Sequence, residues 1–154
     1  MGTIYRMRKL YTILLFFITL SLTSCRIITD NMVSRNINCR TEKINNISIF
    51  FDSNSYYVNN HYSSIIESVA CFLSKNQNVK VILNGYSDIN GGSEYNIALG
   101  QRRANSVYEI MRILGVNDTQ MEIISFGKEK FHKSSDTLEN DLARNRRVDI
   151  IIQH

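Results

Sequence analysis

Proline is absent from the 154 residues of this chain. A linker without proline cannot form the stiff polyproline rod that holds some domains apart, so a tether in this protein is not of that kind. The chain also lacks an internal repeat. Residues 43–154 therefore suit one domain with a single core.

Metal-binding and catalytic patterns are missing as well. The three cysteines form no Cys-x-x-Cys pair and the three histidines are scattered, so the spacing does not favour a metal site. No activated nucleophile appears, and no acid–base pair has a distinctive spacing. A cell-wall enzyme, such as an amidase or a peptidase, is therefore a disfavoured alternative, and no cofactor is expected.

The part of the chain expected to fold also carries no excess of basic residues. The whole chain has a net charge of +4. Residues 1–42 hold six Lys and Arg against two Asp and Glu, whereas residues 43–154 hold twelve against twelve. Nucleic-acid binding calls for a basic patch on the folded domain. The charge distribution therefore predicts no nucleic-acid partner.

The apolar run Tyr11–Leu22 is too short for a membrane span. It has twelve residues and follows Arg6, Arg8 and Lys9, whereas a helix needs about 20 apolar residues to cross a bilayer. A basic start, a short apolar core and a small-residue exit are typical of a secretory signal peptide. The sequence predicts such a peptide at residues 1–24.

The run ends in Leu22-Thr23-Ser24-Cys25, which resembles the lipobox of bacterial lipoproteins. The resemblance implies cleavage before Cys25, a diacylglyceryl group on its thiol and acylation of its new amino group. Two or more acyl chains hold stably on a membrane, whereas one binds reversibly. Arg26 stands where an aspartate would favour the inner membrane, so the resemblance implies an outer-membrane anchor with the domain in the periplasm. The alternative is an ordinary signal peptide with an incidental cysteine.

Residues 25–42 are predicted to be the lipidated cysteine and a polar, flexible tether, and residues 43–154 the folded domain. The periplasm permits disulfides. Cys39 and Cys71 could form a bridge there, but two unpaired thiols are the expectation.

The domain alternates strand and helix patterns. Ser93 is the predicted N-cap of a long helix and Gly115 its C-terminal stop. The alternation predicts an α/β (α+β) sandwich, in which helices pack on one face of a four-stranded mixed sheet. Strands are expected at residues 47–51, 79–83, 121–126 and 148–152, long helices at 62–75 and 94–114, and a short helix at 137–144.

Four sequence blocks carry a family resemblance. They are IFFDSN at 49–54, NGYSDINGGSEYNIALGQRRA at 84–104, SFGKEK at 125–130 and NRRVDI at 145–150. In this order they closely resemble the OmpA-like peptidoglycan-binding domain family and, within it, the peptidoglycan-associated lipoproteins. The chain departs from the family pattern at Tyr86, where histidine is usual, at Gly92-Ser93 and at Ser53. None of these departures removes an expected charge.

The resemblance implies that the ligand is the diaminopimelate of the peptidoglycan stem peptide, whose distal end carries an ammonium and a carboxylate on one carbon. Asp88 would accept from the ammonium, and Arg103 would donate two parallel hydrogen bonds to the carboxylate. Because Arg103 falls on an apolar helix face, Asp88 is also its expected partner. Asn54, Asn96 and Arg146 match other ligand-binding positions of the family.

Plainer interpretations exist for some of these residues. Asp88 could cap a turn, and Asn96 could satisfy backbone groups near the start of its helix. Tyr56 and Tyr57 are predicted to be a packing pair rather than a glycan platform. The implied function is a non-catalytic link between the outer membrane and the cell wall, with a TolB-like periplasmic partner. A scaffold that mainly binds proteins is the alternative.

Overall fold

Four short apolar segments form one mixed sheet. The computed structural model describes residues 47–134 and 137–153, so the expected signal peptide, the lipidation site at Cys25 and the tether lie outside the described residues. The strand order is β1-β4-β2-β3, with β2 and β3 parallel and the other neighbours antiparallel. The strands are β1 (Ile47–Phe50), β2 (Lys80–Tyr86), β3 (Met121–Gly127) and β4 (Arg147–Gln153).

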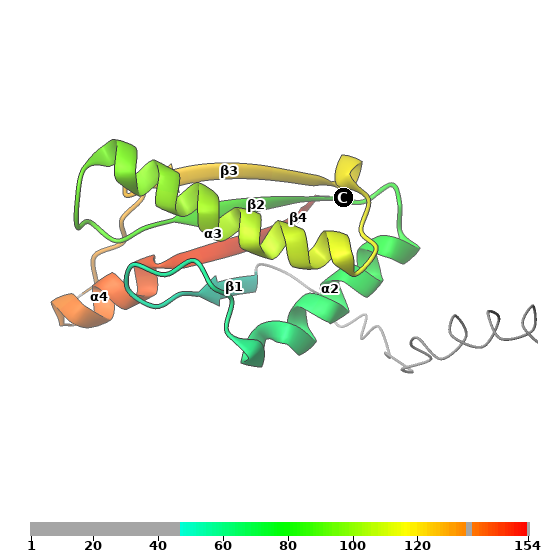
Figure 1. Ribbon diagram of the computed structural model, residues 1–154, viewed down its shortest axis with the longest axis horizontal. Coiled ribbons are helices and arrows are strands. Elements are labelled where there is room, and N and C mark those ends of the chain that lie inside the picture. The colour runs from blue at the N-terminus through cyan, green and yellow to red at the C-terminus, as the bar shows by residue number, and fades with distance from the viewer. Residues whose placement is uncertain (1–46, 135–136, 154) are drawn as a thin grey trace, which may run out of the picture. The chain divides into compact units, whose positions relative to one another are not determined.

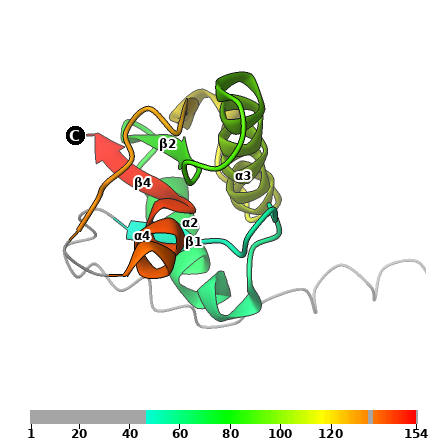
Figure 2. The same cartoon turned by 90° about the vertical axis from the view of Figure 1, so that its left-hand side faces the viewer.

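Two long helices cover the same face of this sheet, as Figures 1 and 2 show. They are α2 (Ser63–Lys75) and α3 (Ser93–Ile113), and α3 lies in the crossover between the parallel strands β2 and β3. The shorter α4 (Leu138–Asn145) lies at one end of the sheet, next to the start of β4. Single 3-10 turns, η1 (Asn60–Tyr62) and η2 (Asp118–Gln120), precede α2 and β3.

The core lies between the sheet and these two helices. Side chains alternate between the two faces of a strand, and the residues that point toward the helices are fully or almost fully buried. Helix α2 adds every third or fourth residue to this core, as the helical period requires. The strand residues are Ile49, Val81, Leu83, Val148 and Ile150, and the α2 residues are Ile66, Val69, Ala70 and Leu73.

Most of the predicted elements are confirmed, and so is the four-stranded mixed sheet with helices on one face. Strand β2 runs three residues beyond its predicted end because Asn84 and Gly85 pair with strands on both sides. Ser93 is not the N-cap. Gly92 takes that position, with no side-chain cap bond, and Ser93 begins the helix.

Cys71 is disulfide-bonded, so the expectation of two unpaired thiols is wrong for this residue. Its partner lies outside the described residues. Among the described helices, none is long and apolar enough to cross a membrane.

Candidate functional site

The predicted site residues come from segments that meet at one end of the sheet. Phe50, the last residue of β1, pairs with Arg147, and Gly85 near the end of β2 pairs with Val148. Strand β4 runs antiparallel to both, so its start lies beside the ends of β1 and β2. The loop after β2 leads into α3, and α4 leads into β4. All these junctions lie at the end of the domain that carries α4 (Figure 1).

Arg103 is the buried centre of this end. Its side chain is fully buried, and its guanidinium donates to three backbone carbonyls. The bonds run from Nε to Ser55 O (2.9 Å), from Nη1 to Tyr86 O (2.9 Å) and from Nη2 to Asp52 O (3.2 Å). Arg103 therefore fastens the loop after β1 to the end of β2.

Burial lowers the pKa of Arg103 to about 10, while the nearby Asp88 carboxylate works in the opposite direction. Burial disfavours the charged form of a base, and an opposite charge favours it. Since this pKa still lies well above neutral pH, the guanidinium keeps its charge at neutral pH. The Phe51 ring, whose centroid is 5.5 Å from the guanidinium carbon, adds a weak cation–π contact.

Asp88 pairs with Arg146 rather than with Arg103, which corrects the expected partnership. Its Oδ2 lies 3.4 Å from Nη1 of Arg146, and no ion pair within 4 Å joins it to Arg103 among the described residues. Its Oδ1 accepts from the backbone N–H of Asn90 at 3.0 Å. Asp88 therefore caps a turn, as the plainer interpretation predicted, and it also forms an ion pair with Arg146.

Arg146 joins three parts of the site. Its Nε donates to Phe51 O at 3.2 Å, and its own carbonyl accepts from Phe51 N at 2.8 Å. Its Nη2 lies 3.7 Å from the Glu139 carboxylate on α4. The neighbouring Arg147 binds Asp149 and lies over the Tyr86 ring at 4.1 Å. Of the two arginines, only Arg146 faces the site, whereas Arg147 packs over the Tyr86 ring.

Asn96 stabilises the loop between β2 and α3. It is fully buried, and its Nδ2 donates to Asn90 O (2.9 Å) and to Gly91 O (3.4 Å). Its Oδ1 is buried without a hydrogen-bond partner. Lys128 holds the same loop from the other side, since its Nζ donates to Gly91 O at 2.9 Å. Asn96 thus positions the loop that carries Asp88, and ligand contact by Asn96 itself would require this loop to move.

Asn54 lies at the exposed tip of the loop after β1. Its backbone is left-handed (φ 53°), a conformation that asparagine tolerates better than most residues. Its Oδ1 accepts from the Tyr95 hydroxyl on α3. This contact joins the loop after β1 to the first turn of α3.

Tyr86, a departure from the family pattern, does not turn its ring toward the site. The ring stacks on Phe126 with centroids 5.4 Å apart and lies under Arg147, so it packs on the side of the sheet away from the long helices. Only the Tyr86 carbonyl reaches Arg103. The exchange of histidine for tyrosine therefore leaves the side chains of the site unchanged.

A pocket of about 320 Å³ opens beside the site, between the segment after β1 and α4. It does not include Asp88 or Arg103, but it shares Phe51, Asp52 and Arg146 with the cluster. Among the described residues, no group of three or more His, Cys, Asp and Glu side chains is arranged to hold a metal ion. The site is therefore one carboxylate and two guanidiniums held by backbone carbonyls.

Sequence reasoning missed the carbonyls of Asp52, Ser55 and Tyr86 as partners of Arg103. Every residue has a carbonyl, so no pattern of side chains could have singled out these three. It also missed Lys128 as a support of the loop, although Lys128 lies in the SFGKEK block.

Comparisons with known proteins identify the family to which this domain belongs. A sequence model of the OmpA family matches residues 50–146, so the chain belongs to the OmpA family. A peptidoglycan-associated lipoprotein of Buchnera aphidicola is 35% identical over 106 residues, which cover 69% of this chain and 61% of that protein. One from Legionella pneumophila is 37% identical over 92 residues, covering 60% of this chain and 52% of the relative. The chain thus spans about half to three-fifths of the length of these curated relatives.

Solved structures agree with this assignment. The crystal structure of the peptidoglycan-associated lipoprotein from Burkholderia pseudomallei superposes with a TM-score of 0.66 and 40% identity, covering 69% of this chain and 89% of that one. The C-terminal domain of Helicobacter pylori MotB has a TM-score of 0.61 and 25% identity, covering 70% and 84%. The predicted resemblance to OmpA-like domains and to the peptidoglycan-associated lipoproteins is confirmed.

Proposed function

We propose that this chain is a non-catalytic lipoprotein that binds the diaminopimelate of the peptidoglycan stem peptide and thereby links the outer membrane to the cell wall. One observation carries the proposal. Asp88, Arg146 and Arg103 meet at one end of a domain whose curated relatives are named peptidoglycan-associated lipoproteins. An ammonium and a carboxylate on the same carbon require one fixed anion and one fixed cation, and this end of the domain offers the Asp88 carboxylate and two guanidiniums.

Asp88 is the proposed acceptor for the ammonium of the ligand. Its contact with Arg146 is 3.4 Å long, whereas a strong bond between a charged donor and a carboxylate is about 2.7–2.9 Å. The ammonium can therefore replace a weak interaction rather than a strong one. The bond from Asn90 to the other oxygen keeps the carboxylate oriented during this exchange.

Arg103 is the proposed donor to the ligand carboxylate. A guanidinium has five N–H donors, and the three carbonyl bonds leave one N–H on each terminal nitrogen. Two such groups match the two oxygens of a carboxylate. Because Arg103 is fully buried, the ligand can reach it only if the exposed loop at residues 52–54 moves aside. Asn54 and Arg146 line that route, and Asn96 holds the opposite loop in place.

The proposed anchor at Cys25 and the tether at residues 25–42 would make modest affinity sufficient. A tethered domain meets many identical stem peptides at high effective concentration, so binding to the wall is multivalent across the membrane surface. A TolB-like periplasmic protein is the proposed second partner, on the strength of the relationship to the peptidoglycan-associated lipoproteins. Co-purification with such a protein from membranes would test this part alone.

Co-sedimentation with purified peptidoglycan sacculi tests the main proposal. The full-length protein in detergent should sediment with sacculi, and free diaminopimelate should release it. Asp88→Asn keeps the acceptor for Asn90 but removes the charge. Loss of one partner of a desolvated pair costs about 2–5 kcal/mol, so binding should weaken about tenfold or more.

Glu122→Gln is the matched control, because Glu122 is exposed at the opposite end of the sheet. Equal binding by wild type and Asp88→Asn would overturn the site. Release of soluble fragments from the sacculi by the protein alone would instead favour a cell-wall enzyme.

A further inference from the structure

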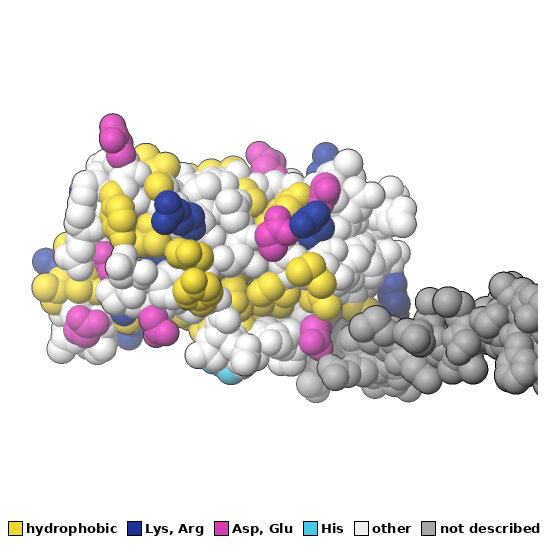
Figure 3. Space-filling view, in the orientation of Figure 1, with side chains coloured by type: hydrophobic (Ala, Val, Ile, Leu, Met, Phe, Trp, Pro, Cys, Tyr) yellow, Lys and Arg dark blue, Asp and Glu magenta, His cyan; other side chains and the backbone are white. Residues whose placement is uncertain are grey.

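A second concave surface lies next to the proposed stem-peptide site. It is a shallow groove of about 570 Å³ between the segment at residues 56–58 and the outer side of α3. Figure 3 shows apolar side chains along this side of the molecule, interrupted by charged groups. The groove is lined by Tyr56, Tyr57, Val58, Arg102, Asn105, Ser106, Glu109 and Ile110.

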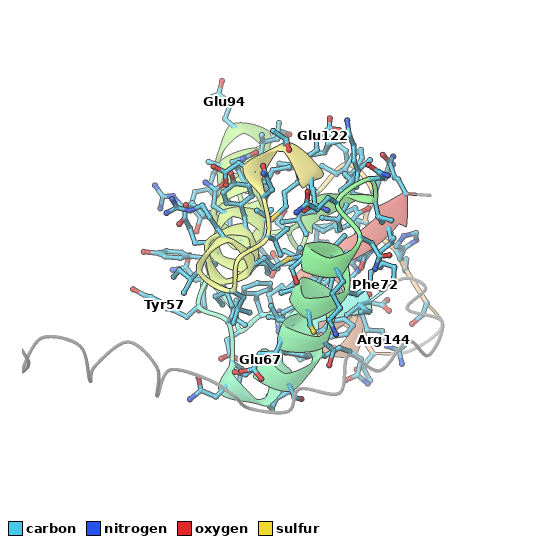
Figure 4. The ribbon with its side chains drawn as sticks, turned by 90° about the vertical axis from the view of Figure 1, so that its right-hand side faces the viewer. Tyr57, Glu67, Phe72, Glu94, Glu122 and Arg144 are labelled. Atoms are coloured by element: carbon cyan, nitrogen blue, oxygen red, sulfur yellow. The ribbon has the colours of Figure 1, made fainter. Side chains whose placement is uncertain are left out.

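One wall of the groove is aromatic. The rings of Tyr56 and Tyr57 stack with centroids 4.8 Å apart and an angle of 29° between their planes. Tyr57 is nevertheless 74% exposed and points away from the domain beside α3 (Figure 4). The two rings pack on each other, as the predicted packing pair, and neither belongs to the hydrophobic core. The Tyr57 N–H donates to Ser55 Oγ at 3.2 Å, so the backbone that presents the rings is held in a turn.

The opposite wall is polar. It offers the Arg102 guanidinium, whose carbon lies 6.0 Å from the centroid of the Tyr56 ring, and the Asn105 amide. It also offers the Glu109 carboxylate, which Arg112 holds at 2.6 Å. Because Arg112 already pairs with Glu109, Arg102 and Asn105 are the polar groups that the groove offers to a ligand, and both can form hydrogen bonds with hydroxyl and amide groups.

We propose that this groove binds the glycan strand of peptidoglycan, a chain of N-acetylated hexosamines; this inference rests on the proposed function. One face of a pyranose ring is made of C–H groups and can cover an aromatic ring, which removes apolar surface of both from water. The hydroxyl and acetamido groups at the edge of the sugar would then face Arg102 and Asn105.

The groove is lined by residues that directly follow or precede residues of the proposed stem-peptide site. Tyr56 follows Ser55, whose carbonyl accepts from Arg103, and Arg102 precedes Arg103 on α3. In peptidoglycan the stem peptide is attached to the glycan, so the two ligands also lie side by side. A stable protein partner would need about 20–30 residues on each side. Eight lining residues are too few for that but sufficient for a few sugar rings.

Calorimetric titration of the full-length protein in detergent tests the inference with two ligands. One is a diaminopimelate-containing stem peptide, and the other is the same peptide attached to its disaccharide. The disaccharide should raise the affinity about two- to tenfold, the range expected for an aromatic contact. Tyr57→Ala should abolish this gain and leave the affinity for the bare peptide unchanged. Tyr57→Phe is the matched control, because it keeps the ring and should keep the gain.

A disaccharide that adds nothing to the affinity would overturn the glycan groove while leaving the proposed function intact. Equal weakening of the bare peptide and of the peptide attached to its disaccharide by Tyr57→Ala would also overturn the glycan groove and leave the proposed function intact. If neither ligand binds, the proposed function fails, and a tetramer of N-acetylglucosamine decides the groove separately. In that case shifts of the backbone amide NMR signals of Tyr56, Tyr57 and Asn105 would uphold it. Unmoved signals, or shifts that depend on protein concentration alone, would overturn it.

Discussion

Gly85 of β2 lies directly against Gly100 of α3. A Cβ atom added to Gly85 would come within 2.1 Å of the Gly100 carbonyl oxygen. Because neither residue carries a side chain, the helix approaches the strand closely at this point. The contact lies one residue before Tyr86 and three residues before Arg103, whose side chain donates to the Tyr86 carbonyl. This close approach therefore positions the buried arginine of the site.

Gly85→Ala should destabilise the domain, because the atom it would meet belongs to the backbone and cannot rotate away. Forcing extra atoms into a packed region costs about 1–3 kcal/mol, and the melting temperature should fall by about 4–8 °C for each kcal/mol. Thermal unfolding followed by circular dichroism measures the loss. Gly92→Ser is the control, since nothing lies within 4 Å of a Cβ at Gly92. An unchanged melting temperature for Gly85→Ala would show that α3 and β2 can separate at little cost.

Reduction should lower the stability of the domain, because Cys71 is disulfide-bonded. A disulfide contributes about 2–4 kcal/mol in typical cases. The melting temperature of the oxidised protein should therefore fall when a reductant is added. Cys71→Ala should melt at the lower temperature under both conditions. The only other cysteines are Cys25 and Cys39, so a domain that begins at Lys43 should lose the same increment. A melting temperature that does not respond to reductant would contradict this prediction.

Lipid attachment at Cys25 is a separate prediction, because it depends on the leader and not on the folded domain. Cys25→Ser removes the thiol that would receive the diacylglyceryl group, and membrane attachment would then be lost. Metabolic labelling with an alkyne fatty acid should mark the wild type and leave the variant unmarked. Cys39→Ser should be labelled like the wild type. Equal labelling of Cys25→Ser and wild type would show that the lipobox resemblance is misleading.

The sequence was sufficient for most of the helices and strands and for bringing Asp88, Arg103 and Arg146 to one end of the sheet, but not for the partners of these side chains. The helical period of α3 correctly placed Arg103 on the buried face, and the motif blocks brought Asp88 and Arg146 to one end of the sheet. Which of two guanidiniums pairs with Asp88 depends on distances of about an ångström, and such distances are fixed only when the loops pack. The carbonyl partners of Arg103 could not be predicted for a related reason. Ser55 and Asp52 come within hydrogen-bond distance of Arg103 only in the folded domain.

Replacing Arg103 by lysine should have a larger effect than replacing Arg146 by lysine. Lysine keeps the charge but has a single nitrogen and no planar fork. In Arg103→Lys this nitrogen cannot reach all three carbonyls, two in the loop after β1 and one at the end of β2. Carbonyls left unpaired in a buried place cost about 1–3 kcal/mol. The variant should therefore melt at a lower temperature and bind sacculi about tenfold more weakly or worse, measured where circular dichroism shows it folded.

Arg146→Lys should be milder in both respects. Its ammonium can still pair with the Asp88 carboxylate, while the bond to the Phe51 carbonyl and the longer contact with the exposed Glu139 are lost. We expect sacculus binding within about threefold of wild type, since one neutral acceptor is worth about 0.5–1.5 kcal/mol. Arg112→Lys, at an exposed position on α3, controls for the exchange itself. If folded Arg103→Lys binds like the wild type while Arg146→Lys does not, the ligand carboxylate belongs to Arg146. Binding then would not require the loop over Arg103 to open.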